Sequence, residues 1–253
     1  MKTLACVKRV PDTGAKIVLT DDNQQIDTSN LGFTMSPHEE CALEEAVRLT
    51  EDHGGTATAL TLGSAEADEQ LRTALAMEAD DAVLLETDGD EWGPVDTAAA
   101  IADYVRDADD DFDVLLFGNE SADAANYQVG VHVANRLDLP CVNGVKSLSV
   151  DDGTVVAKRE VTGGEEVYEV PTPAVVTVKE GLNEPRYPSV RSKMQARKQD
   201  VPNVAPERRG ADTVRRVRLD APEQDDTPAE VLGESADAAD DVVDVLADDL
   251  EVL

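Results

Sequence analysis

Residues 114–130, VLLFGNESADAANYQVG, contain the pattern that decides the fold. Val114 to Phe117 form a short, continuous apolar run, which predicts a buried strand. Gly118 ends that run, and Ala125 to Leu137 has the spacing of a helix with one apolar face. A buried strand that passes through a glycine-containing loop into a helix is the repeating unit of α/β proteins.

The same unit recurs along the first 140 residues, where short apolar runs alternate with segments of helical spacing. This alternation predicts an α/β fold with a doubly wound, mostly parallel sheet, covered by helices on both faces and joined by right-handed crossovers. The expected strands are residues 3–7, 56–62, 82–85, 114–117 and 173–178, and the expected helices begin at Pro37, Ser64, Val95 and Ala125.

The pattern changes at residue 145. Three β-rich segments follow, separated by an Asp-Asp-Gly turn and a Gly-Gly turn, which predicts a β-hairpin insertion at 145–170. A smaller hairpin is expected around Asp21-Asp22-Asn23. Residues 1–180 are therefore expected to form one α/β domain that includes the larger hairpin.

Charge divides the rest of the chain into two segments. Residues 179–218 hold 11 of the 22 basic residues and 5 acids, so we expect an extended, locally positive C-terminal arm at 181–218. Residues 219–253 hold 13 acids and no base. This composition predicts a flexible acidic linker, and the apolar residues between Val242 and Leu250 predict a short helix at its end.

The composition of the 253-residue chain restricts its partners. It carries 54 acidic and 22 basic side chains, a formal net charge of −32, and 3% aromatic residues. Such a charge repels nucleic acid and anionic lipid, so neither is expected as a partner, and it is also typical of salt-adapted proteins. Cys6, Cys41 and Cys141 are too widely spaced for a Cys-x-x-Cys motif, and no apolar run suits a signal peptide or a membrane span. We expect a cytoplasmic protein with reduced cysteines.

Three loops that follow predicted strands are candidate binding sites: the loop after Val7, the Gly63-Ser64 turn and residues 118–130. The third is favoured, because glycine lets a phosphate approach the backbone and N–H groups at a helix start attract anions. No Walker-type lysine or Gly-x-Gly-x-x-Gly motif is present, so an ordinary strand-to-helix loop stays open as an interpretation. The three histidines lack metal-ligand spacing and no nucleophile motif occurs, so we expect no metal site and no catalytic residue.

Further motifs occur in a fixed order along the chain. They are VKRVPD at 7–12, MSP at 35–37, EEAVRL at 44–49, TALAM at 73–77 and GLNEPRY at 181–187. Together they resemble the β subunit of the electron transfer flavoproteins, a family that also contains the FixA proteins. The resemblance implies a Rossmann variant similar to the adenine-nucleotide α-hydrolases.

The resemblance also implies a function, that of an electron-carrier subunit and not of an enzyme. An α subunit would be the heterodimer partner, would hold most of the site for the redox-active FAD, and would receive the terminal helix of this chain. Electrons would arrive from acyl-CoA dehydrogenases or other flavin dehydrogenases and leave to electron transfer flavoprotein–quinone oxidoreductase. This chain would hold AMP or a second FAD. The loop at 118–130 ends in Gln-Val-Gly, which resembles the bifurcating or FixA-like branch of the family.

The resemblance also implies functional residues, each at a position of this chain that matches a motif of the family. The implied cofactor-binding residues are Cys6, Ser36, Pro37, His38, Glu39, Leu62, Gly118, Asp123, Ala124, Ala125, Asn126, Tyr127, Gln128, Val129 and Gly130. The implied partner-binding residues are Arg159 and Glu160 at the α-subunit interface, and Leu182, Asn183, Glu184, Pro185, Arg186, Tyr187, Val190 and Met194 on the arm that docks the dehydrogenase. A free-standing adenine-nucleotide-binding module is the alternative, but such a module has no need of residues 155–250.

The acidic composition predicts that salt stabilises the fold, because ions screen the repulsion between neighbouring carboxylates. The melting temperature, measured by circular dichroism, is expected to rise between millimolar and molar KCl. The same melting temperature at both concentrations contradicts this prediction.

Overall fold

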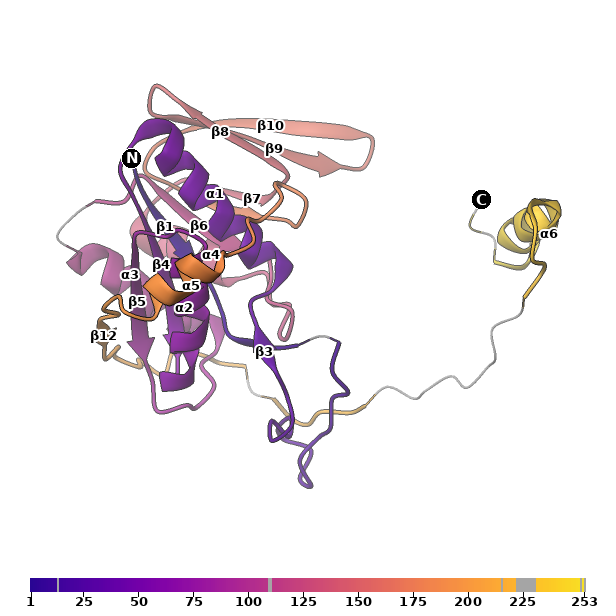
Figure 1. Ribbon diagram of the computed structural model, residues 1–253, viewed down its shortest axis with the longest axis horizontal. Coiled ribbons are helices and arrows are strands. Elements are labelled where there is room, and N and C mark those ends of the chain that lie inside the picture. The colour runs from indigo at the N-terminus through magenta and orange to yellow at the C-terminus, as the bar shows by residue number, and fades with distance from the viewer. Residues whose placement is uncertain (13, 109–110, 215, 222–230, 251, 253) are drawn as a thin grey trace. The chain divides into compact units, whose positions relative to one another are not determined.

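The computed structural model describes residues 1–12, 14–108, 111–214, 216–221, 231–250 and 252. The chain divides into two units, Met1–Val217 and Arg218–Leu253. The first unit contains the predicted α/β domain and most of the arm that follows it (Figure 1).

A seven-stranded sheet forms the centre of the first unit, and every neighbouring pair of its strands is parallel (Figure 1). The predicted doubly wound parallel sheet is therefore confirmed. The sequence did not indicate the two edge strands, because one contains Asn143 and Gly144 and the other has two residues. Across the sheet the strands are β12 (Asn203–Val204), β5 (Asp81–Glu86), β4 (Thr56–Gly63), β1 (Lys2–Cys6), β6 (Val114–Gly118), β11 (Ala174–Val178) and β7 (Cys141–Val145).

Helices cover both faces of this sheet, and each face has its own apolar core. The helices α1 (Pro37–His53) and α2 (Asp68–Ala76) contribute to one cluster, while α3 (Pro94–Asp107) and α4 (Val129–Leu137) contribute to the other. Strand β6 supplies both clusters in turn, because successive side chains of a strand point to opposite faces. Leu116 is in the first cluster, and Leu115 and Phe117 are in the second.

Proline and serine set the helix starts that the sequence indicated. Pro37 and Pro94 are the first residues of α1 and α3, where a missing N–H costs nothing. Ser64 precedes a 3₁₀ turn, η1 (Ala65–Ala67), and α2 follows that turn directly. The helix predicted from Ser64 is thus divided into a tight first turn and an α-helix.

Helix α4 begins at Val129, four residues later than predicted. The backbone explains the difference, because Ala125 and Tyr127 have φ angles of 46° and 56°. Such left-handed residues cannot continue a right-handed helix. Residues 119–128 are therefore an irregular loop between β6 and α4.

The predicted β-hairpin insertion is present, and its three β-rich segments each form a strand. Strands β8 (Ser147–Asp151), β9 (Thr154–Val161) and β10 (Gly164–Pro171) form a separate antiparallel sheet. Val145 belongs to the end of β7 in the main sheet and not to this insertion. Two further strands, β2 (Val10–Pro11) and β3 (Phe33–Thr34), pair with each other, and the smaller predicted hairpin is reduced to one bridge between Leu19 and Ile26.

The arm returns to the α/β domain. Its helix α5 (Val190–Ala196) packs on α2, with Ala196 buried, and β12 then joins the sheet beside β5. In the second unit a 3₁₀ turn, η2 (Ala236–Ala238), leads into α6 (Ala239–Asp244) and a π-helical turn, η3 (Val245–Asp249). The sequence predicted a short helix there; residues 222–230 of the predicted linker lie outside the described residues. Within the described part of the chain, no helix combines the length and the apolarity of a membrane span.

Candidate functional site

A cavity of about 430 Å³ lies at the carboxyl ends of β1, β4 and β6. The chain passes from β1 to β4 and β5 on one side, and then crosses to β6 on the other side of β1. Ligands of open α/β sheets bind where the strand order reverses in this way, and sites for small molecules have volumes of about 300–1,000 Å³. The position and size of this cavity suit a small-molecule ligand.

Two glycines bring the walls of the cavity together. A Cβ atom at Gly118 would lie 2.8 Å from Cγ of Glu39, and one at Gly130 would lie 2.8 Å from Cγ2 of Thr177. Gly130 therefore allows α4 to pack against the sheet. A β-branched residue at Gly130 would disturb this packing as well as any bound ligand.

An ion pair ties the loop before α4 to the segment after β1. Nζ of Lys8 donates hydrogen bonds of 2.8 and 2.6 Å to the two carboxylate oxygens of Asp123. Burial acts to raise the pKa of Asp123, but the charge and hydrogen bonds of Lys8 outweigh it and hold the pKa below its ordinary value. Lys8 was not among the predicted site residues, although it is the second residue of the VKRVPD motif.

Glu39 is a buried carboxyl group in the cavity wall, on the first turn of α1. Its Oε2 accepts a 3.1 Å hydrogen bond from the Ser36 N–H at the helix start. Burial raises the pKa of Glu39 to about 7, although backbone hydrogen bonds from Ser36 and Lys8 oppose the shift. Burial also raises the pKa of the neighbouring Cys6 thiol, so this side chain stays protonated at neutral pH.

Two cavity residues carry donors without a protein partner. The guanidinium carbon of Arg9 lies 3.4 Å from the centroid of the Phe33 ring. The ring of Trp92, the single tryptophan of the chain, has its centroid 5.4 Å from the guanidinium carbon of Arg208. Nε of Arg9 and Nε1 of Trp92 are buried and have no hydrogen-bond partner within the described residues. A bound ligand could satisfy both donors.

Most of the predicted cofactor-binding residues line this cavity. They are Cys6, Glu39, Leu62, Gly118, Asp123, Ala124, Asn126, Tyr127, Val129 and Gly130. Ser36, Pro37, His38, Ala125 and Gln128 do not line it. His38 has another role: its Nδ1 accepts a 2.7 Å hydrogen bond from the Glu180 N–H and so fastens the start of the arm to α1.

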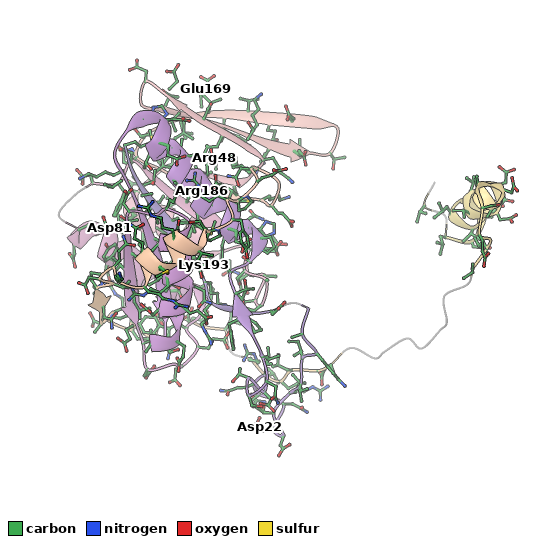
Figure 2. All side chains as sticks on the ribbon, in the orientation of Figure 1. Asp22, Arg48, Asp81, Glu169, Arg186 and Lys193 are labelled. Carbon is green, nitrogen blue, oxygen red and sulfur yellow. The ribbon has the colours of Figure 1, made fainter. Side chains whose placement is uncertain are left out.

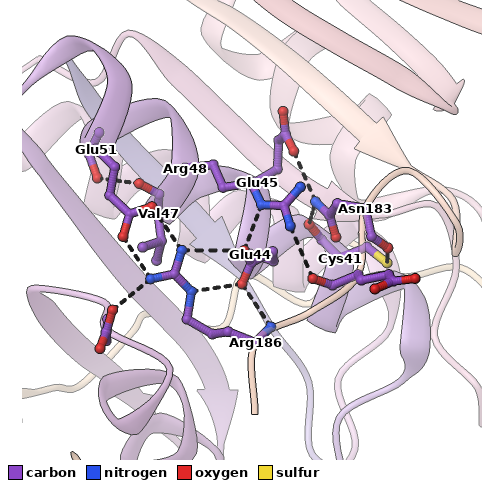
Figure 3. Close-up of polar contacts among 11 residues, drawn as sticks. Cys41, Glu44, Glu45, Val47, Arg48, Glu51, Asn183 and Arg186 are labelled. Carbon is purple, nitrogen blue, oxygen red and sulfur yellow. Dashed lines mark hydrogen bonds and ion pairs between the residues drawn. The ribbon is translucent and has the colours of Figure 1, made fainter. Parts of the chain in front are cut away.

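Arg186 connects the predicted partner-binding run to α1 (Figure 3). Its Nε donates a 2.9 Å hydrogen bond to Glu44, and its guanidinium also binds Glu51 and Glu78 at 2.7 Å. Burial acts to raise the pKa of Glu44, but hydrogen bonds from Arg186 and Arg48 outweigh it and lower the pKa. Arg186 therefore holds the arm in place and compensates a buried carboxylate.

The other residues of this run divide into buried and exposed groups. Asn183 donates hydrogen bonds to the Cys41 carbonyl and to Glu45, at 3.0 and 2.9 Å (Figure 3). Leu182 is partly buried against the core, and the carbonyl of Glu184 accepts a 3.1 Å hydrogen bond from Arg48. Pro185 is exposed, and Tyr187, Val190 and Met194 are 89%, 77% and 59% exposed. Lys193 lies on α5 (Figure 2). Its Nζ is 4.9 Å from the Tyr187 ring centroid.

Arg159 and Glu160 lie on β9 and differ in their surroundings. Nε of Arg159 donates a 2.6 Å hydrogen bond to Glu166 on β10, which also accepts one from the Tyr168 hydroxyl at 2.7 Å. Glu160 is exposed and lies opposite Glu165, another carboxylate. In the described parts of the chain no group of three or more His, Cys, Asp and Glu side chains could hold a metal ion.

Comparisons with known proteins give one consistent result. The family model described as "Electron transfer flavoprotein domain" matches residues 24–229. Electron transfer flavoprotein subunit beta of Bacillus subtilis strain 168 is 39% identical over 203 residues, which are 79% of this chain and 77% of that protein. The human subunit beta is 31% identical over 247 residues, 96% of this chain and 95% of that protein. The mitochondrial subunit beta of Oryza sativa subsp. japonica is 31% identical over an alignment of 256 positions that covers 100% of both chains.

The raised pKa of Glu39 predicts a specific pH dependence of stability. A folded-state pKa of about 7, above the ordinary 4.5, means that the native chain binds this proton more tightly than the unfolded chain. The resulting contribution to the free energy of unfolding is complete below about pH 4.5 and is lost as the pH rises towards 7, a change on the order of 3 kcal/mol.

Glu39→Gln, which carries no titrating proton, should lack this loss. Its free energy of unfolding relative to the wild type should rise between pH 5 and 8, as measured by urea unfolding. Glu169→Gln is the control, because Glu169 is exposed on β10 (Figure 2). A difference between Glu39→Gln and wild type that stays constant from pH 5 to 8 contradicts the assignment.

Proposed function

Because the chain belongs to the family of electron transfer flavoprotein β subunits, we propose that it works as a heterodimeric electron carrier together with an α subunit. The α subunit holds most of the site for the redox-active FAD. The flavin supplies the redox chemistry, and the residues of this chain bind, orient and shield cofactors. The chain acts as a carrier and not as an enzyme.

The cavity at the ends of β1, β4 and β6 binds the phosphate and nucleoside of AMP, or of a second FAD. The observation that carries this assignment is the juxtaposition of Lys8, Arg9 and the start of α4 in one cavity of suitable size. Cationic side chains and the N–H groups of a helix start both favour an anion. The buried, unpartnered Nε of Arg9 supports the fit, because a phosphate oxygen would provide its missing acceptor.

Each named group in the cavity has a distinct role. Asp123 holds Lys8 and so keeps the loop before α4 folded against the end of β1. Ala125 and Tyr127 turn the backbone through left-handed conformations, so that α4 begins only at Val129 and the N–H groups of its first turn are left to bind an anion. Glu39, whose pKa burial raises to about 7, carries less negative charge beside the phosphates at neutral pH than an ordinary carboxylate would.

The exposed side chains of Tyr187, Val190 and Met194 dock the electron donor, an acyl-CoA dehydrogenase or another flavin dehydrogenase. They form an apolar group on and beside α5, flanked by the basic residues Arg191 and Lys193. An apolar centre with a charged rim suits a transient protein interface. Electrons leave to a quinone oxidoreductase. The α subunit is contacted by Glu160, which is exposed on β9.

The electron transfer takes place in the cytoplasm, a location that the three free cysteines support.

Asp123→Ala should release the nucleotide. The substitution removes the anchor of the loop and a charge-assisted hydrogen bond of about 1.5–3 kcal/mol, so AMP affinity should fall at least tenfold. The measurement is isothermal titration of the purified heterodimer with AMP, together with counting of AMP and flavin after denaturation. Glu169→Ala, a charge-matched change on β10, should bind as the wild type does.

Three outcomes of this experiment are informative. One flavin and one AMP per heterodimer identify a simple carrier, whereas two flavins and no AMP identify a bifurcating, FixA-like subunit. Full AMP affinity in Asp123→Ala removes this cavity as the nucleotide site.

Val190→Ala should slow reduction of the heterodimer by the dehydrogenase. The change removes an exposed apolar contact, so the second-order rate constant for reduction is expected to fall several-fold while flavin content stays the same. Val217→Ala is a matched control, because Val217 is also 77% exposed. Unchanged reduction by Val190→Ala, or dissociation of its heterodimer, contradicts the docking role.

A further inference from the structure

Residues 203–212, here called the strap, run from β12 along the loop between β5 and α3. Asn203 and Val204 pair with Leu84 and Leu85 of β5. Further on, Nη2 of Arg208 donates a 2.9 Å hydrogen bond to the Glu91 carbonyl. The strap therefore follows the same segment of the domain from the sheet to the first turn of α3.

The strap ends in a reciprocal clasp with that first turn. The carboxylate of Asp212 accepts hydrogen bonds from the N–H groups of Val95 at 2.9 Å and Asp96 at 3.3 Å. In return, Oδ1 of Asp96 accepts a 2.9 Å hydrogen bond from the Ala211 N–H. The first N–H groups of a helix have no partner inside the helix, and a nearby side chain normally caps them. Here a residue more than 100 positions away in sequence provides the cap.

Gly93 makes this long-range cap possible. It occupies the N-cap position of α3, where a serine or aspartate would ordinarily supply the capping oxygen. A Cβ atom at Gly93 would lie 2.5 Å from the carboxylate of Asp212. Because Gly93 has no side chain, it cannot cap the first N–H groups of α3, and it leaves space for the Asp212 carboxylate to do so.

The turn held by the clasp is a wall of the cavity. Trp92, Gly93, Pro94 and Thr97 line the cavity, while the strap itself contributes no lining residue. The strap contacts the other side of this wall, where Arg208 lies over the Trp92 ring and Asp96 is 1% exposed. Opening the clasp would release the wall without removing any group that faces the ligand.

We propose that the clasp between Asp212 and the start of α3 is a conformational switch that sets the nucleotide affinity of the cavity. With the clasp closed, Trp92 and the first turn of α3 are fixed and the cavity is preorganised; with the clasp open, the wall moves and the ligand binds more weakly. The coupling is reciprocal, so a bound nucleotide also holds the strap closed. The inference rests on the proposed function only in taking an adenine nucleotide as the ligand.

Asp212→Ala and Asp212→Asn test the switch in the purified heterodimer. Loss of a helix cap to alanine should weaken AMP binding between about twofold and thirtyfold, whereas asparagine caps well and should retain most of the affinity. Glu207→Ala removes an exposed carboxylate from the strap outside the clasp, and its AMP affinity should equal that of the wild type. Binding is measured by titration with AMP, followed through Trp92 fluorescence and calorimetry.

Gly93→Ala provides an independent variant, because its Cβ atom would displace the Asp212 carboxylate. If both changes act through the clasp, Gly93→Ala should weaken AMP binding when it is made in the wild type. Made in Asp212→Ala, the same change should cause little further loss of AMP affinity. Amide hydrogen exchange gives the readout that separates a switch from a static cap. AMP should slow exchange at Ala211, Val95 and Asp96 in the wild type, as reciprocity requires.

The outcomes separate the two proposals. If the wild type binds AMP and Asp212→Ala binds it with the same affinity, the switch is overturned and the proposed function stays intact. Exchange at Ala211 that AMP does not change also overturns the switch, because a static cap has no coupling to the ligand. A wild-type heterodimer that binds neither AMP nor FAD in this chain overturns the nucleotide assignment, and the switch falls with it.

Discussion

The parallel arrangement of the central strands is the constraint on which the rest of the first unit depends. Parallel neighbours require a crossover, and crossovers on both faces bury the apolar sides of α1 to α4. The same arrangement brings the carboxyl ends of β1, β4 and β6 to one edge of the sheet. The cavity lies at that edge because the chain changes sides there, from β4 and β5 to β6. The fold therefore sets the place of the site, and the loops set its chemistry.

Charge organises the arm in a way that composition alone does not reveal. Residues 179–218 are rich in bases, but several of these arginines are paired with acids of the domain. Arg186 binds Glu44, Glu51 and Glu78, and Arg209 and Arg216 bind Asp103 and Glu91. Much of the positive charge thus fastens the arm to an acidic surface. In the proposed function, Arg191 and Lys193 of α5 are the bases that flank the docking surface.

The sequence predicted the fold well where one residue sets one local feature. Pro37 starts α1. The continuous apolar run of β6 supplies side chains to the core on each face of the sheet. The start of α4 was misplaced, because the left-handed conformations of Ala125 and Tyr127 leave no signature in residues that also suit a helix. Edge strand β12 was missed for a related reason, since its pairing with β5 depends on the path of the whole arm.

Prediction of the site followed the same division. Loop residues such as Asp123 and Gly118 could be identified because strand, glycine and helix follow each other in sequence. Lys8 and Arg9 reach the cavity from the loop after β1, and Trp92 reaches it from the loop between β5 and α3; the folded sheet brings these two loops together. The Asp212 cap of α3 is more distant still, and its one local sign is a glycine in place of a capping residue at position 93.

The most direct test of the nucleotide assignment is a crystal structure of this chain in complex with its α subunit. We expect density for an adenine nucleotide in the cavity, with its phosphate beside Lys8, Arg9 and the loop that precedes α4. A cavity filled by solvent or side chains, with every nucleotide of the complex bound elsewhere, would contradict it.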